Sequence, residues 1–465
     1  MPIFEHVSHY PQPRAEVFAW HTRPGGFVRL TPPGMARVVE GPTDLINPGS
    51  EIVLKISHPL VSGLVPRPLA KVGATWRVRH VELDDGRLFV DEQVSGPFRR
   101  WRHEHHFADA PDGGTTITDR VDWELPPMPT GIDEMVASHE LRRLFAFREH
   151  QLREDLALHA RLGAAPTHVL VSGASGLIGS QVCALLTTGG HPVTKLVRRA
   201  PRAADEARWS PDYDSVDDGA VERAAAVVHL AGESIGGRFT EAKKRRILDS
   251  RVEGTRTIAA AIARSGRRQV LAQASAIGAY GARRPGELLT EQSALGTGFL
   301  ADVVRAWEDA AGAADGRTVF LRTGIVLSEG GGALAPMLPL FLAGVGGPLT
   351  DPRAWMSWIT LDDMARSYLH ALFTPGLDGP VNAVAPEPVT AGEFARTLGR
   401  TVRRPAVLRT PGFGPALVLG PEGKDQLIDT DQRVDAGKLL ASGFRFGEPT
   451  LREGLRHVLR HDERG

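Results

Sequence analysis

The order of hydrophobic and polar residues changes character near residue 165 of the chain. Before that point, hydrophobic and polar residues alternate with the period of two that is typical of half-buried strands. Strands are predicted at residues 51–57, 74–83, 87–93, 99–109 and 115–125, the last two joined by the turn sequence PDGG. A short helix is predicted at 14–21 and a long one at 134–162, so this part has an α+β pattern.

The pattern after residue 165 is different, because apolar strands there alternate with alanine-rich helices. This alternation predicts an α/β fold with a parallel sheet. The break is the sequence RLGAAPTHVLVSG, in which a helix ends at Gly163, Pro166 interrupts the pattern and a strand begins at Thr167.

Length, charge balance and cysteine content limit the number of domains, the kind of ligand and the cellular location that are expected. The chain has 465 residues, so two or three domains are expected. Lys+Arg and Asp+Glu both number 55, and this balance argues against nucleic-acid binding, which needs a basic surplus. Cys183 is the single cysteine, and the first residues lack the basic and apolar regions of a signal peptide. A cytoplasmic location is therefore expected.

One uncharged segment, residues 330–350, is long enough to span a bilayer. It contains six glycines and three prolines, which a helix interior tolerates poorly. The segment predicts an apolar loop and a short helix lining a cleft, and no membrane span is expected.

The first strand of the second region runs into the glycine-rich sequence GASGLIGSQV. Glycines at a strand-to-helix junction permit a tight turn and let the backbone approach a pyrophosphate, which also meets the N-terminus of the helix. The residues predicted to contact a dinucleotide here are Gly173, Ser175, Gly176, Leu177, Ile178 and Gly179.

The next strand ends in Arg198 and Arg199, where an acidic residue would accept a hydrogen bond from a ribose 2′-hydroxyl. Cations at this place suit a 2′-phosphate, so NADP(H) is favoured over NAD(H), with Arg198 as the first candidate contact. Arg322, expected to begin a loop after the strand at 319–321, is a further candidate. Small residues at the end of an intervening strand would let the backbone pass close to the cofactor: Leu230, Ala231 and Gly232.

Residues 167–465 resemble an atypical branch of the extended short-chain dehydrogenase/reductase superfamily, the nucleoside-diphosphate-sugar epimerase-like family. The stretches that carry this resemblance are HLAGESI, KKRRILDSRVEGT, SAIGAYG, FLADVVRAWEDAA, RTGIVLSEGGGAL and SWITLDD. The tail resembles the C-terminal domain peculiar to this branch. The resemblance implies an NADP-binding Rossmann domain with a doubly wound parallel sheet at 167–400, and a small C-terminal lobe at 401–465 that completes a substrate cleft.

The first region resembles the START-like (SRPBCC) superfamily in RLTPP at 29–33, GPF at 96–98 and a set of aromatic and histidine residues. That set is Phe18, Trp20, His21, Trp101, His103 and His105. The resemblance implies a helix-grip domain at 1–163 that encloses a cavity, often for an apolar ligand.

The histidines of this region raise the question of a metal. On a strand, Trp101, His103, His105 and Phe107 would share one face, with His106 on the other. Two histidines at this spacing can share a metal, but no cysteine is near and aromatic residues flank the pair. The pattern favours hydrogen-bonded histidines in a cavity wall, and no metal site is predicted.

The superfamily's usual catalytic groups are a Ser or Thr, a Tyr and a Lys four residues after it. If Glu308 occupies the acidic helix position, Leu300 and Val304 stand where the Tyr and Lys would be. A register one residue off gives Phe299 and Val303 instead. The hydroxyl position falls on Ala276, one residue after Ser275. The usual acid is absent in either register.

Two hypotheses follow. The first is an NADP(H)-dependent oxidoreductase or epimerase-like enzyme acting on a small molecule through rearranged groups, with Tyr280 and Ser275 as catalytic candidates. Lys243, Arg251 and Ser357 (between Trp355 and Trp358) are further polar candidates. The second is a non-catalytic NADP(H) sensor or regulatory protein coupled to an apolar ligand or a cell-division partner. Structural roles remain open for all of them: Tyr280 packing over the nicotinamide pocket, Lys243 and Arg251 on a solvated helix face, and the tryptophans in the core.

Overall fold

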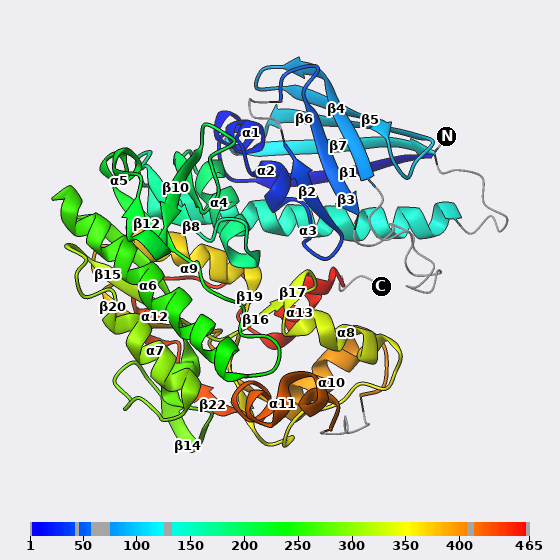
Figure 1. Cartoon of the computed structure of the whole chain (residues 1–465). Helices are drawn as coiled ribbons and strands as arrows, with labels where there is room; N and C mark the ends of the chain where they lie inside the picture. The colour runs from blue at the N-terminus through cyan, green and yellow to red at the C-terminus, as the bar shows by residue number, and fades with distance from the viewer. Residues whose placement is uncertain (1, 42–45, 57–74, 125–132, 407–412, 462–465) are drawn as a thin grey trace. The chain divides into compact units, whose positions relative to one another are not determined.

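The computed structural model describes residues 2–41, 46–56, 75–124, 133–406 and 413–461. The chain divides into two compact units (Figure 1). The first unit comprises residues 1–163, 187–190 and 460–465, and the second comprises 164–186 and 191–459. Among the described residues, no helix is both long and apolar enough to cross a membrane.

The first unit is built on an antiparallel sheet of seven strands in the order β1-β7-β6-β5-β4-β3-β2. The strands are β1 (Ile3–Tyr10), β2 (Ala36–Glu40), β3 (Glu51–Ile56), β4 (Thr75–Asp84), β5 (Leu88–Ser95), β6 (Arg100–Asp109) and β7 (Thr115–Glu124). The helices are α1 (Arg14–Thr22), α2 (Gly26–Arg29) and α3 (Asp133–Leu162). All five predicted strands and both predicted helices are present, and α3 begins within one residue of the predicted start.

Two strands of this sheet were not predicted. In β1, Phe4 and Tyr10 are buried, but Ile3 and Val7 are 53% and 62% exposed while Ser8 is buried, so only part of the strand follows the usual placement of apolar and polar residues. Strand β2 has five residues, most of them outside the core. Neither strand carries a hydrophobic alternation that a sequence pattern could reveal.

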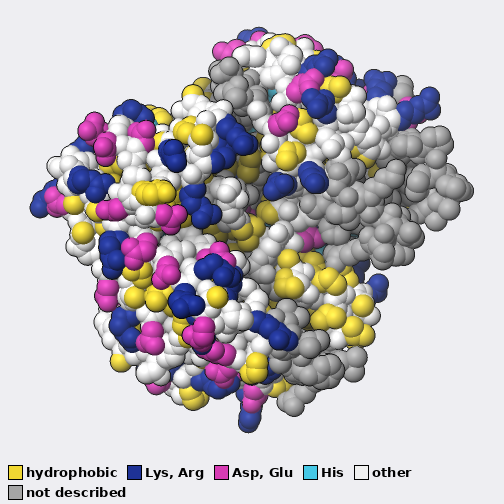
Figure 2. Space-filling view, in the orientation of Figure 1, with side chains coloured by type: hydrophobic (Ala, Val, Ile, Leu, Met, Phe, Trp, Pro, Cys, Tyr) yellow, Lys and Arg dark blue, Asp and Glu magenta, His cyan; other side chains and the backbone are white. Residues whose placement is uncertain are grey.

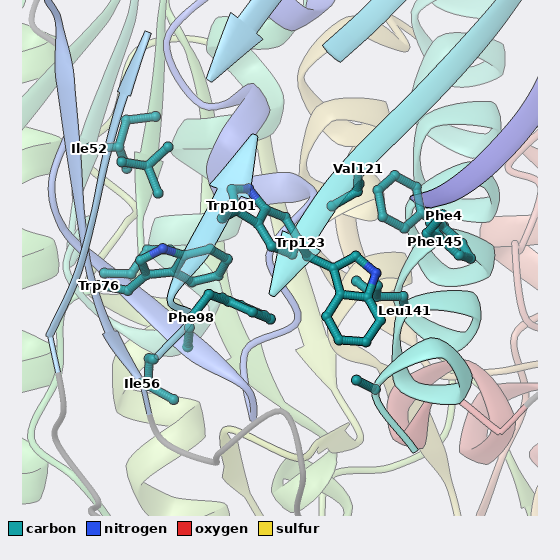
Figure 3. Packing of buried hydrophobic residues seen from close by; sticks show 14 residues of the cluster. Phe4, Ile52, Ile56, Trp76, Phe98, Trp101, Val121, Trp123, Leu141 and Phe145 are labelled. Carbon is teal, nitrogen blue, oxygen red and sulfur yellow. The ribbon is translucent and has the colours of Figure 1, made fainter. Parts of the chain in front are cut away.

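Large aromatic side chains form the core between this sheet and α3 (Figure 3). Trp76, Trp101 and Trp123 come from three different strands and are each less than 10% exposed. Helix α3 contributes Leu141 and Phe145 to the same cluster. Burial of these large apolar surfaces, each of about 150–250 Å² for an aromatic residue, fixes α3 against the sheet.

The second unit has an eight-stranded sheet in the order β11-β10-β9-β8-β12-β13-β15-β20, parallel except for β11. Its strands are β8 (Val169–Ser172), β9 (Val193–Val197), β10 (Glu206–Ser210), β11 (Ser215–Val216), β12 (Ala226–His229), β13 (Val270–Ala276), β15 (Thr318–Thr323) and β20 (Gly379–Ala383). The intervening helices include α4 (Leu177–Thr188), α5 (Asp218–Arg223), α6 (Glu241–Ser265), α7 (Phe299–Asp309) and α9 (Leu361–Phe373). This order confirms the predicted doubly wound, Rossmann-like sheet, whose strand order reverses between β8 and β12.

Shorter elements complete the second unit. The strands are β14 (Arg283–Leu289), β16 (Ile325–Ser328), β17 (Gly331–Gly332), β18 (Trp355–Met356), β19 (Trp358–Thr360), β21 (Val389–Thr390) and β22 (Asp431–Val434). The helices are α8 (Leu334–Leu342), α10 (Ala391–Thr401), α11 (Phe413–Leu427), α12 (Gly437–Ala441) and α13 (Leu451–Leu459). Trp358, Phe341, Phe394 and Leu455 share one core, so segments on both sides of residue 400 pack together.

The surface shows the charge balance of the sequence. Basic and acidic side chains are interspersed over the face drawn in Figure 2. Hydrophobic side chains gather over α8 in the same view, where Leu340 is 39% exposed and Val345, just beyond the helix, is 46% exposed. Helix α8 itself confirms the short helix predicted within residues 330–350.

Candidate cofactor and active site

The loop between β8 and α4 depends on two glycines. Gly173 has a φ of 69°, and a Cβ there would lie 2.7 Å from the carbonyl carbon of Leu230. A Cβ on Gly179 would lie 2.1 Å from the backbone oxygen of Gly173. The loop can therefore fold this tightly only with glycine at both positions. Ser175 and Gly176 are exposed at its tip, directly before α4 begins at Leu177 with Ile178 next to it.

The Ser172 side chain forms hydrogen bonds with the last residue of β12 and the two residues after it, beside this loop. Its hydroxyl lies 2.5 Å from Nδ1 of His229 and accepts the backbone N–H groups of Leu230 and Ala231 at 3.2 and 3.4 Å. Burial lowers the pKa of His229 to about 3, so the ring is neutral and Ser172 donates to it. Leu230 and Ala231 are thereby held next to Gly173 of the glycine loop, and the cofactor contact expected of Leu230, Ala231 and Gly232 stays a prediction. Ser172 and His229 lie within apolar strands and belong to no motif, so the sequence pattern does not predict them.

The two arginines after β9 have different environments. Arg199 forms a two-pronged ion pair with Glu206, at 2.8 and 2.6 Å. Arg198 is exposed, and no hydrogen bond or ion pair of its side chain occurs within the described residues. The guanidinium of Arg198 is therefore the one available to a ligand at this end of the sheet.

A buried polar network lies at the ends of β13 and β15. Ser275 donates to Oε1 of Glu308 at 2.6 Å, and Arg322 donates to both oxygens of Glu308 at 2.9 and 2.8 Å. Arg322 also donates to the Tyr280 hydroxyl at 3.1 Å, and that hydroxyl donates to Oδ1 of Asn382 at 2.7 Å. Both catalytic candidates, Ser275 and Tyr280, thus use their hydroxyl protons inside this network.

Burial separates these groups from solvent. Tyr280 is fully buried, while Ser275 and Arg322 are each 3% exposed. Burial raises the pKa of Tyr280, although Arg322 opposes the shift. The pKa of Arg322 is raised because Glu308 outweighs the effect of burial. The expectation that Arg322 begins a loop is wrong, because β15 continues to Thr323 and the guanidinium is bound to Glu308.

Helix α7 presents an apolar face where the superfamily has its Tyr and Lys. Leu300, Val304 and Glu308 are spaced four residues apart and lie on one side of the helix. Because Glu308 reaches the ends of β13 and β15, that side faces the strand ends. Val303 packs against Ile247 of α6, in a cluster that Leu300 also contacts. The hydrogen bonds of Glu308 support the register in which Leu300 and Val304 occupy the Tyr and Lys positions. Neither of these side chains can act as an acid or a base.

The remaining polar candidates on α6 have partners. Lys243 forms an ion pair with Glu233 at 2.8 Å. Arg251 donates to the backbone oxygen of Glu233 and lies 4.9 Å above the ring of Trp307. Burial lowers the pKa of Arg251 to about 10. Of the two roles left open for Arg251, the solvated helix face does not fit, because its guanidinium is hydrogen-bonded and lies over Trp307.

Ser357 lies between β18 and β19 and binds the backbone of β22. It is 1% exposed, donates to the backbone oxygen of Gln432 at 3.0 Å and accepts from the backbone N–H of Val434 at 2.9 Å. Trp358 is fully buried in the core, and Trp355 stacks with Arg433. Ser357 therefore holds β22 in place and has no free hydroxyl proton for a substrate.

Comparison with known proteins identifies the family. A model of the NAD dependent epimerase/dehydratase family matches residues 169–382. An epimerase family protein of Mycobacterium bovis is 40% identical over 291 residues, which cover 62% of this chain and 96% of that protein. This chain belongs to the NAD dependent epimerase/dehydratase family. The epimerase-family chain also matches a C-terminal domain of unknown function, DUF1731, over residues 410–458.

Two crystal structures resemble this epimerase-family chain. Human epimerase family protein SDR39U1, crystallised with NADPH, is 30% identical with a TM-score of 0.57, and the match covers 63% of this chain and 98% of the human one. A nucleoside-diphosphate sugar epimerase from Corynebacterium glutamicum is 31% identical with a TM-score of 0.80, covering 99% of this chain and 91% of that one. The second likeness extends over residues of both units.

Proposed function

We propose that the second unit binds NADP(H) and that the chain is an NADP(H)-dependent oxidoreductase or epimerase-like enzyme for a small-molecule substrate. The observation that carries this proposal is the glycine loop at Gly173 and Gly179 together with the unpaired, exposed Arg198 at the end of the adjacent strand. The NADPH in the human relative supports the choice of cofactor. Membership of an epimerase family favours an enzyme over a non-catalytic sensor.

The residues that would hold the cofactor come from three strand ends. The pyrophosphate would lie on the loop from Gly173 to Gly179, whose backbone N–H groups and helix N-terminus attract anions. Arg198 would bind the 2′-phosphate, and Arg199 is a weaker candidate because Glu206 already binds it. Leu230, Ala231 and Gly232 would allow the ribose and adenine to approach. When bound, the nicotinamide supplies or accepts hydride.

The buried network has a positioning role in this proposal. Ser275 and Tyr280 hold the ion pair between Arg322 and Glu308 in place, and their own protons stay within the network. The apolar pair Leu300 and Val304 excludes water from the position that an acid would occupy. We therefore propose that substrate or residues outside the usual triad supply the proton transfers.

We propose that two other parts of the chain, residues 1–163 and 401–465, also contribute to ligand binding. Residues 1–163 form a START-like helix-grip domain for an apolar ligand, supported by the sheet, the long helix α3 and an aromatic core. Residues 401–465 form a C-terminal lobe that completes the substrate cleft of the Rossmann domain at 167–400. Cys183 is the single cysteine and is buried, so no disulfide can form within the chain, which supports a cytoplasmic location in this proposal.

A fluorescence titration with NADPH and NADH tests the cofactor proposal. The wild-type protein is expected to bind NADPH at least about tenfold more tightly than NADH, because a charge-assisted contact contributes roughly 1.5–3 kcal/mol. Arg198→Ala should weaken NADPH binding by about 10- to 100-fold and leave NADH binding unchanged. Arg199→Ala is the matched control and should have a smaller effect. Equal affinities in the wild type, or equal losses for both cofactors in Arg198→Ala, would refute the assignment.

A further inference from the structure

A second cluster of titratable residues lies on the inner face of the antiparallel sheet, far from the proposed NADP(H) site in sequence. His80 of β4 stands opposite Asp91 of β5, which in turn stands opposite His103 of β6. His105 of β6 stands opposite Asp119 of β7. All five residues are buried. The strand register therefore brings three imidazoles and two carboxylates together inside the unit.

Asp119 fixes which nitrogen of each ring carries a proton. Its Oδ1 lies 3.0 Å from Nε2 of His103 and 2.7 Å from Nδ1 of His105. A carboxylate oxygen at these distances from two ring nitrogens accepts a hydrogen bond from each of them. In the neutral rings, the lone pairs are then those of His103 Nδ1 and His105 Nε2, on the opposite side of each ring.

Those two lone pairs meet the second carboxylate. Oδ2 of Asp91 lies 3.6 Å from His103 Nδ1 and 3.5 Å from His105 Nε2. The other carboxylate oxygen accepts a 3.4 Å hydrogen bond from the indole N–H of Trp101, which orients the group. One ligand atom from each of Asp91, His103 and His105 lies within 4.8 Å of the others. Ligands at about 2.1 Å from a tetrahedral ion are separated by about 3.4 Å, close to the distances found here.

His80 gives independent support. It is 4% exposed, and neither of its ring nitrogens has a hydrogen-bond partner among the described residues. A buried imidazole without partners is costly unless it binds something. His80 stands directly opposite Asp91 in the strand register, outside the group of three whose ligand atoms lie within 4.8 Å of one another, so it is a candidate fourth ligand that would have to turn toward the ion.

We propose that Asp91, His103 and His105 bind a divalent transition-metal ion of the Zn²⁺ type. His80 is the fourth ligand, and Asp119 orients both imidazoles from behind, as carboxylates do for histidine ligands of metals. Two or three imidazoles with a carboxylate are the ligand set that such ions prefer. The sequence favoured hydrogen-bonded histidines, and the bonds to Asp119 agree with that. The spacing of the histidines along β6 does not reveal the carboxylates of Asp91 and Asp119, because these lie on the neighbouring strands β5 and β7.

A proton is the competing occupant of the same gap. An imidazolium at His105 would also satisfy the cluster, because each of its two N–H groups would have a carboxylate acceptor, Asp119 at 2.7 Å and Asp91 at 3.5 Å. The two alternatives differ in a measurable way. A metal ion displaces the proton and binds with a fixed stoichiometry, whereas a proton alone leaves no metal affinity.

The test uses the untagged full-length protein, stripped with a chelator and dialysed. Calorimetric titration with Zn²⁺ is expected to show one tight equivalent per chain. Titration with Co²⁺ is expected to give the visible absorption bands of a four-coordinate site containing nitrogen ligands. His105→Ala and Asp91→Asn should each remove the tight equivalent, a loss of at least about 100-fold in affinity. His106→Ala is the matched control, because His106 lies on the same strand with a 48% exposed side chain facing away, and it should bind like the wild type.

A positioning variant keeps the test decisive if a ligand variant does not fold. Asp119→Asn should fold, keep the stoichiometry and lower the affinity about 10- to 100-fold, since it weakens only the support of the rings. Absence of a tight equivalent in the wild type would overturn the proposal. Wild-type affinity in folded His105→Ala or Asp91→Asn would also overturn it, because the ion would then be bound elsewhere.

Discussion

The ion pair between Glu308 and Arg322 gives the sharpest test of the buried network. Glu308 accepts three hydrogen bonds, two from the guanidinium at 2.9 and 2.8 Å and one from Ser275 at 2.6 Å. The side chains of Arg322 and Glu308 are only 4% and 12% exposed. Glu308→Ala leaves a buried guanidinium without its carboxylate, which costs about 3–5 kcal/mol. The free energy of unfolding should therefore fall by about that amount.

A double-mutant cycle separates this effect from simple loss of packing. The stability of the wild type, Glu308→Ala, Arg322→Met and the double variant would be measured by urea unfolding followed by circular dichroism. The double variant should be destabilised by about 2 kcal/mol less than the sum of the two single variants, because it contains no orphaned charge. Ser275→Ala removes one hydrogen bond and should cost about 1 kcal/mol. A loss below about 1 kcal/mol in Glu308→Ala, or additive losses in the cycle, would refute the reasoning.

Three further predictions follow from positions described above. Gly179→Ala should abolish NADPH binding in a fluorescence titration, since its Cβ would lie 2.1 Å from a backbone oxygen of the loop, while Gly376→Ala, with open space around it, should not. Burial lowers the pKa of His229 to about 3, so the unfolded state binds a proton below about pH 6.5 and the folded state does not. Stability should therefore fall as the pH drops from about 7 toward 3, by at most about 1.4 kcal/mol per pH unit, and His229→Gln should remove that contribution in urea titrations at several pH values. The double substitution Leu300→Tyr and Val304→Lys should create NADPH-dependent reduction of a generic carbonyl, and unchanged inactivity with intact NADPH binding would show that more than the pair is missing.

The Rossmann-like unit was predictable because its signals are local. The strand at Val169–Ser172 is continuous and apolar, a glycine loop follows, and Leu177–Thr188 is a helix, all within about twenty residues. Strand β1 was not predictable, because exposed Val7 and buried Ser8 contradict the rule that links hydrophobicity to burial. That strand is fixed by its pairing with β7, which lies more than one hundred residues later.

The candidate site was predictable only in part, because it also depends on contacts between segments that are distant in the sequence. The glycine loop and Arg198 could be read from spacing, but the function of each polar group depends on partners from distant segments. Tyr280 resembles a catalytic group until Asn382 and Arg322 are seen to take up its hydroxyl. Likewise, the histidines of β6 acquire their chemistry from Asp91 and Asp119, which only the sheet register brings beside them.

The parallel pairing of β14 with β22 has a consequence for the synthesis of the chain. Residues Arg283–Leu289 must wait for Asp431–Val434 to emerge from the ribosome before their edge is covered. The same late segment supplies Gln432, which binds the backbone oxygens of Ile277 and Gly281 beside Tyr280. A nascent chain can thus complete the glycine loop early, but it completes the surroundings of Tyr280 almost last. Chains that stop short of residue 431 should expose an unpaired strand and be targets for chaperones or proteases.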